Sequence, residues 1–145
     1  MIKHVLALPL LVPALLAATL PTTADARPED YAEGQVWQYA ARPQDPGSLL
    51  KIQKIEMEDG RPVYHVSVVG VHFSHMTRAG ALPHLPVSAE ALDASVIRRV
   101  VIAASFPDAD AEEGIAEWHV ERGGVLTTPL AQVLNDVDAM LSRPI

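Results

Sequence analysis

The feature that most constrains the fold is the alternating apolar run over residues 62–73, the best strand pattern in the chain. Tyr64, Val66 and Val68 fall on one face of such a strand, and further valines occupy the other. Residues 58–61 precede it with Asp-Gly at their centre, which is typical of a tight hairpin turn. The pattern therefore predicts an antiparallel pair ending in this strand.

Two shorter strands are predicted before this hairpin turn. Residues 36–39 place two aromatic side chains on one face. Residues 49–57 alternate imperfectly, so we expect a β-bulge near Gln53–Lys54. A turn-rich stretch over residues 42–48 separates the two strands. Three strands joined by short turns predict a three-stranded antiparallel meander.

The second half of the chain is rich in helical patterns. A long irregular loop is predicted over residues 74–87, followed by helices over residues 89–104 and 111–122. The last helix is predicted to start at Pro129, capped by Thr128. Strands first and helices afterwards predict an α+β fold, with about three helices packed on one sheet face.

The first 26 residues have the pattern of an export signal, so we do not expect them to form part of the folded domain. A basic start precedes an almost wholly apolar run from Val5 to Leu20. Ala24 and Ala26 are the small residues that a signal peptidase reads, so we expect cleavage before Arg27. Residues 27–145 are then expected to form a single α+β domain.

The alternative for this start is an uncleaved membrane anchor. The apolar run is shorter than the roughly 20 residues of a spanning helix, and it contains Pro9 and Pro13. The absence of cysteine excludes a lipid-modified cysteine and also any disulfide. Frequent Ala, and Arg in preference to Lys, suggest a GC-rich bacterial genome. We expect a periplasmic protein, with release to the medium as the second choice.

The net charge of −7 limits the kinds of partner that the chain is expected to bind. Such a charge disfavours nucleic acid and anionic membranes as partners, and it favours a basic protein. No cofactor motif is found, and no particular oligomeric state is indicated.

Histidines are the first candidates for a functional site. His72 and His75 flank the predicted end of the third strand, and Arg78 and His84 follow in the predicted loop. Three imidazoles from one loop could bind a metal, but no recognised ligand spacing is present, so no metal site is predicted. Because function concentrates on loops held by rigid elements, we predict a binding surface here. Trp37 is an additional candidate for lining a ligand site.

An acidic surface is the second candidate. Glu113, Glu117 and Glu121 are four residues apart and would stack along one helix face. Paired carboxylates can hydrolyse glycosides, but this needs burial and separated pKa values. A solvated face or a docking surface for a basic partner is the simpler interpretation.

Residues 34–39 match the pattern G-x-V-W-x-Y, and residues 82–88 match the pattern L-P-H-x-P-V-S. With this opening and this segment, the chain resembles a family of small uncharacterised bacterial exported proteins. The likeness runs from about residue 31 to residue 137 and implies no established activity. It singles out as specific positions Trp37, Arg42, His65, His84 and Ser88.

The motif inventory favours binding over catalysis. The chain has no G-x-S-x-G nucleophile elbow, no cysteine nucleophile and no Gly-rich phosphate loop opening a helix. We therefore expect a non-enzymatic protein-binding module of the bacterial envelope, such as an immunity protein or an inhibitor. A small metal-dependent or carboxylate hydrolase is the alternative.

Overall fold

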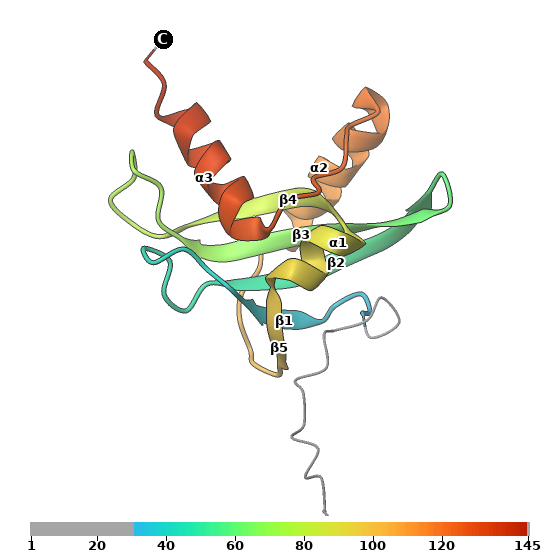
Figure 1. The fold of residues 1–145 in the computed structure, drawn as a ribbon, viewed down its shortest axis with the longest axis horizontal. Helices are drawn as coiled ribbons and strands as arrows, with labels where there is room; N and C mark the ends of the chain where they lie inside the picture. The colour runs from blue at the N-terminus through green and yellow to red at the C-terminus, as the bar shows by residue number, and fades with distance from the viewer. Residues whose placement is uncertain (1–30, 145) are drawn as a thin grey trace, which may run out of the picture.

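The computed structural model describes residues 31–144, so the signal-peptide prediction for residues 1–26 lies outside them. In the described part, one antiparallel sheet has the strand order β4-β3-β2-β1-β5, and three helices pack on it (Figure 1). No helix there is long and apolar enough to cross a membrane. The elements in chain order are β1 Val36–Tyr39, β2 Leu49–Glu58, β3 Arg61–Val71, β4 Gly80–Ser88, α1 Ala89–Ser95, β5 Val96–Val100, α2 Asp108–Glu121 and α3 Leu130–Leu141.

The hairpin of β2 and β3 follows the sequence pattern closely. Asp59 and Gly60 both have positive φ, 49° and 76°, as a two-residue turn that matches the strand twist requires. The pairing register shifts between Ile52 and Lys54, where the broken alternation predicts a bulge. The central hairpin is therefore encoded locally, by its turn residues and by its alternation.

The predicted three-stranded meander is wrong, although the class is α+β. Strand β4 occupies most of the segment for which turn residues predict a loop, and it pairs with β3. Its prolines, Pro83 and Pro86, are compatible with a strand because β4 lies at the sheet edge. An outward-facing backbone nitrogen has no ladder partner there, so proline removes no hydrogen bond.

The predicted helix over residues 89–104 is also wrong in its second half. Helix α1 ends at Ser95, and β5 follows at once and pairs antiparallel with β1. Val96 and Val100 fit a helical spacing of four, but β-branched residues suit a strand equally well. Pairing with the open edge of β1 decides between these two possibilities.

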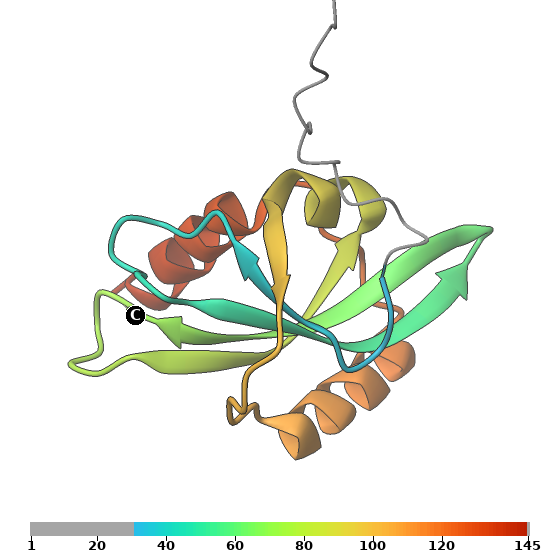
Figure 2. The same cartoon turned by 90° about the horizontal axis from the view of Figure 1, so that it is seen from below.

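The helices cover both faces of the sheet, which corrects the prediction of a single covered face. Figure 2 shows α1 and α3 on one side and α2 on the other. Helices α1 and α3 bury the main hydrophobic core. Its fully buried aliphatic side chains include Leu50, Ile52, Val66, Val68, Leu92, Leu130 and Leu134.

Two serines fix the ends of the core helices. Ser88 Oγ accepts a hydrogen bond from the Ala91 amide at 3.1 Å, as an N-cap of α1. Ser95 Oγ accepts one from the Leu130 amide at 2.9 Å. Helix α3 is therefore capped by α1 rather than by Thr128, and this contact joins the two helices.

A buried ionic network joins two loops to α3. Arg42 donates from Nε to Asp45 at 2.7 Å and from one terminal nitrogen to Asp138 at 3.3 Å. Its other terminal nitrogen donates to the carbonyl oxygen of His72 at 3.1 Å. Asp45 accepts the His72 amide, and Asp138 accepts the amide and hydroxyl of Ser74. The network explains why this arginine and these carboxylates lie inside the fold.

Candidate functional site

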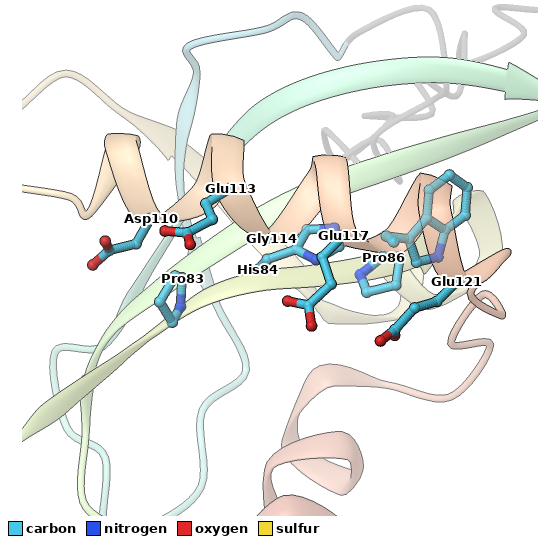
Figure 3. A pocket seen from close by; sticks show the side chains of 9 residues that line it. Pro83, His84, Pro86, Asp110, Glu113, Gly114, Glu117 and Glu121 are labelled. Carbon is cyan, nitrogen blue, oxygen red and sulfur yellow. The ribbon is translucent and has the colours of Figure 1, made fainter.

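A groove with a volume of about 510 Å³ lies between helix α2 and strand β4. Figure 3 shows the helix and the strand side by side, with acidic side chains along the groove. Of the residues that the structure describes, four carboxylates line it and no Lys or Arg does. The lining residues are Pro83, His84, Pro86, Asp110, Glu113, Gly114, Glu117, Trp118 and Glu121.

The spacing within α2 explains why the carboxylates gather on one side. Ala111, Ile115 and Trp118 recur at intervals of three and four residues, and they are buried. A second set of residues, also spaced three and four apart, is exposed and therefore forms another face of the same helix. This set comprises Asp110, Glu113, Glu117 and Glu121.

Gly114 lets the helix come close to the strand. A Cβ atom built at this position would lie 2.7 Å from Cβ of His84 and 3.1 Å from its Cγ. Contacts this short are not tolerated between non-bonded carbons, so any side chain at position 114 would push α2 away from β4. The glycine therefore sets how close the carboxylates lie to the strand.

Strand β4 provides an apolar floor to the groove. Pro83 and Pro86 line the groove together with Trp118, which is buried. The end of the strand is closed by Leu126, whose amide donates to Pro86 and whose carbonyl accepts from Ser88. Each proline lacks an N–H group, which discourages another strand from pairing with this edge.

A chain of polar side chains leads from the groove across β3 and β2 and back to α2. His84 Nε2 and His65 Nδ1 share a hydrogen bond of 2.8 Å. On the other side of the ring, His65 Nε2 lies 3.9 Å from Glu56 Oε1. Glu56 in turn contacts His119 Nε2 at 2.8 Å and Lys54 Nζ at 3.0 Å. We call His84, His65, Glu56 and His119 the histidine chain.

His65 is the central member of the histidine chain. Its side chain is fully buried, and its Nε2 atom has no hydrogen-bond partner among residues 31–144. The Trp118 ring packs edge-on against it, with centroids 4.9 Å apart, while Trp118 Nε1 donates to the Gly124 carbonyl. A buried nitrogen without a partner is costly and uncommon, which marks this position as unusual.

The electrostatics of the histidine chain favour neutral rings at His84 and His65 and an ionised carboxylate at Glu56. Burial, and then the charge of His84, lower the pKa of His65 to about 4. Burial also lowers the pKa of His84, against the opposing pull of Glu56. Burial alone would raise the pKa of Glu56, but hydrogen bonds from His119 and Lys54 outweigh it and lower this pKa. Near neutral pH, His84 and His65 are therefore uncharged and Glu56 is an anion.

The structure divides the residues of the predicted loop surface between two places. His75 and Arg78 are exposed in the turn between β3 and β4. His72 is exposed beside them, and its ring nitrogen lies 3.6 Å from Asp45. His84 instead belongs to β4 and lines the acidic groove. The loop surface of His72, His75 and Arg78 stays a prediction.

The other predicted site residues also have clear positions. Glu113, Glu117 and Glu121, predicted as a separate acidic surface, meet His84 in one groove. Trp37 is buried in the core, in edge contact with Tyr31, and its Nε1 donates to Gln35.

Sequence reasoning missed several residues of the site. Asp110 has the helical spacing of the other carboxylates, so extending the periodicity by one turn finds it. His119 and Glu56 gave no such signal, because they come from separate elements and meet only in the folded chain. Pro83 and Pro86 were recognised in the sequence, but prolines predict a loop, so they were not assigned to the floor of a groove.

A second groove of about 520 Å³ lies along α2 and includes His119 and Asp108. Asp108 is already paired there with Lys51 at 2.9 Å, and it accepts a hydrogen bond from Gln53 at 2.7 Å. Within residues 31–144, no group of three or more His, Asp or Glu side chains is arranged to hold a metal ion. Among the described residues, the groove beside β4 has four carboxylates without an ion-pair partner, whereas the second groove has two, Glu33 and Glu112.

No family model matches the chain, and neither a curated protein nor a solved structure is similar to it. The likeness to small exported bacterial proteins therefore stays a prediction, and function must be inferred from the groove itself.

Proposed function

We propose that this protein is a non-enzymatic binding module of the bacterial envelope that holds a basic segment of a partner protein in the groove between α2 and β4. The four groove carboxylates carry the proposal, because they are exposed and none has an ion-pair partner among the described residues. An immunity protein or inhibitor that acts on a basic partner in the periplasm or the medium would need such a surface.

The spacing of the carboxylates suits an extended chain. Residues four apart on a helix are separated by about 6 Å along its axis. Alternate residues of an extended strand are separated by about 6.7 Å. Cationic side chains at every second position of a bound segment would therefore face Glu113, Glu117 and Glu121 in turn.

The floor of the groove suits the remainder of a basic side chain. Lys and Arg bury their aliphatic stems on apolar surface while the charged head stays near water. Pro83, Pro86 and Trp118 provide that surface beside the carboxylates. The same prolines discourage strand pairing, so side chains rather than backbone ladders would provide most of the affinity.

Catalysis by the carboxylates has less support than binding. A carboxyl that serves as a general acid needs an apolar environment that separates its pKa from that of its neighbour. Asp110, Glu113, Glu117 and Glu121 are all exposed on a helix surface. An exposed row of like charges fits a docking surface better than a hydrolase centre.

The test is calorimetric titration of the full chain with a capped seven-residue peptide carrying Lys at every second position, in about 20 mM salt. We expect binding that weakens about tenfold in a variant combining Glu113→Gln, Glu117→Gln and Glu121→Gln. Three exposed ion pairs contribute about 0.5 kcal/mol each, and about 1.4 kcal/mol is a factor of ten in affinity.

A matched variant controls for net charge. Asp59→Asn, Glu90→Gln and Asp136→Asn together remove the same three charges from exposed positions outside the groove. This variant should bind nearly as well as the wild type. Equal weakening in both variants, or no binding by the wild type, would show that the groove is not the binding site. A peptide of the same composition with its lysines consecutive should bind less well, since consecutive side chains of a strand point to opposite sides.

A further inference from the structure

We propose that the histidine chain links the groove to pH: when His84 takes up a proton, His65 is held in its Nε2–H tautomer and the groove releases its basic segment. This inference rests on the proposed function and concerns the regulation of the same site. It stands on the short contact between two imidazoles, on the buried nitrogen without a partner, and on the position of His84 in the groove.

The first step follows from the hydrogen bond between the two rings. A contact of 2.8 Å between His84 Nε2 and His65 Nδ1 needs one N–H donor and one lone pair. While both rings are neutral, either of them can be the donor. A protonated His84 carries hydrogen on both ring nitrogens, so it must donate to His65. The Nδ1 atom of His65 must then be bare, and its one proton lies on Nε2.

The second step concerns where that proton points. His65 Nε2 faces Glu56 Oε1 at 3.9 Å, and Glu56 is held as an anion by His119 and Lys54. An N–H at this position is attracted by the carboxylate, whereas a bare Nε2 accepts a hydrogen bond from no donor in the described part of the chain. Protonation at the groove therefore selects the tautomer of His65 that Glu56 favours.

The charged groups around the histidine chain set the sign of the effect. Strand β2 contributes Lys54 and Glu56, and α2 contributes His119 and the groove carboxylates Asp110, Glu113, Glu117 and Glu121. A proton on His84 adds a positive charge beside those carboxylates, and it competes with the cations of a bound segment. By linkage, a bound segment lowers the affinity of His84 for its proton by the same factor.

The pH range follows from burial. His84 takes up its proton below the usual histidine range, because burial lowers its pKa. His65, with a pKa of about 4, is neutral at pH values well above 4, and there its single proton lies on Nε2 once His84 is charged. Release of the segment thus belongs to mildly acidic solution.

The test combines two measurements on the full chain. Ring-nitrogen NMR shifts of ¹⁵N-histidine-labelled protein, titrated from about pH 7.5 to 4.5 without peptide, distinguish the tautomers of His65. Calorimetry with the alternating-lysine peptide is then done at pH 7.5 and one unit below the measured midpoint of His84. We expect the Nε2–H form of His65 to grow with the His84 midpoint. The peptide should bind about five-fold more weakly at the lower pH, the low end of coupling between sites.

Variants separate this linkage from other causes of pH dependence. His84→Gln should lose most of the ratio between peptide affinity at pH 7.5 and at the lower pH, whatever its own affinity at pH 7.5, with the fold checked by circular dichroism. An unchanged tautomer of His65 across the His84 midpoint, or an equal pH effect in His84→Gln, overturns the linkage. Loss of the pH effect in His75→Gln instead would assign it to the loop after β3 and would also overturn the linkage. Absence of peptide binding at pH 7.5 overturns the proposed function, and the tautomer titration then decides separately whether the proton linkage exists.

Discussion

Replacing Arg42 by Met should destabilise the fold strongly. The guanidinium is buried and donates hydrogen bonds to Asp45, Asp138 and the His72 carbonyl. Methionine fills a similar volume but leaves Asp45, which is fully buried, with the His72 amide as its donor and the exposed His72 ring nitrogen at 3.6 Å. Removing one partner of a buried ion pair costs about 3–5 kcal/mol, mostly because the other charge stays buried.

Thermal and urea unfolding, followed by circular dichroism, measure this loss. At about 3–6 °C per kcal/mol for a domain of this size, the melting temperature should fall by about 10–30 °C. Arg78→Met makes the same chemical change at an exposed position and should shift stability by less than about 0.5 kcal/mol. Adding Asp45→Asn to Arg42→Met should recover part of the loss, because it removes the uncompensated charge. A loss below about 1 kcal/mol for Arg42→Met would refute this interpretation of the network.

Three further predictions concern the core, the groove and acid stability. Leu134→Ala, at a fully buried position, should cost about 2–5 kcal/mol in urea unfolding, whereas Met140→Ala, 66% exposed, should be nearly neutral. Gly114→Ala should destabilise by about 1–3 kcal/mol through overpacking against β4, although alanine favours a helix. Gly124→Ala is the control, because a Cβ atom added at position 124 would lie in open space. If Gly114→Ala instead stabilised the protein, the close contact between α2 and β4 would be contradicted. The pKa of His65 is about 4 in the folded protein, whereas its ordinary value, expected in the unfolded chain, is 6.5. Between pH 4 and pH 6.5 the unfolded state therefore binds more protons than the folded state. Stability should be full above about pH 6.5 and fall toward pH 4. A His65→Phe variant should have a flatter melting profile over that range, and an unchanged slope would show that His65 is not responsible.

The parts of the fold that depend on neighbouring residues were predictable from the sequence. Asp59-Gly60 determines its turn, and the alternation of β3 requires a strand whatever its partners are. The parts of the fold that depend on pairing with residues far away in the sequence could not be predicted. Val96–Val100 becomes a strand because β1 offers it an open edge, and Gly80–Ser88 becomes one because β3 does.

The site was predictable to a similar extent. The row formed by Glu113, Glu117 and Glu121 follows from helical periodicity, and the histidines were identifiable as candidates. Their combination was not, because the predicted loop around His84 is a strand, and Gly114 brings α2 onto that strand. Glu56 was not connected to His65 either. The contact depends on the exact register of β2 against β3, and the predicted bulge near Gln53–Lys54 places that register only approximately.

Backbone amide NMR of the full chain during titration with the alternating-lysine peptide tests the central claim most directly. We predict that the largest shift changes lie in residues 110–121 and at His84 and Leu85, on the two sides of the acidic groove. Small changes are expected in residues 72–78, which hold the alternative loop surface. The largest changes at His72, His75 and Arg78, with the groove unaffected, would contradict the claim and make that loop the binding surface.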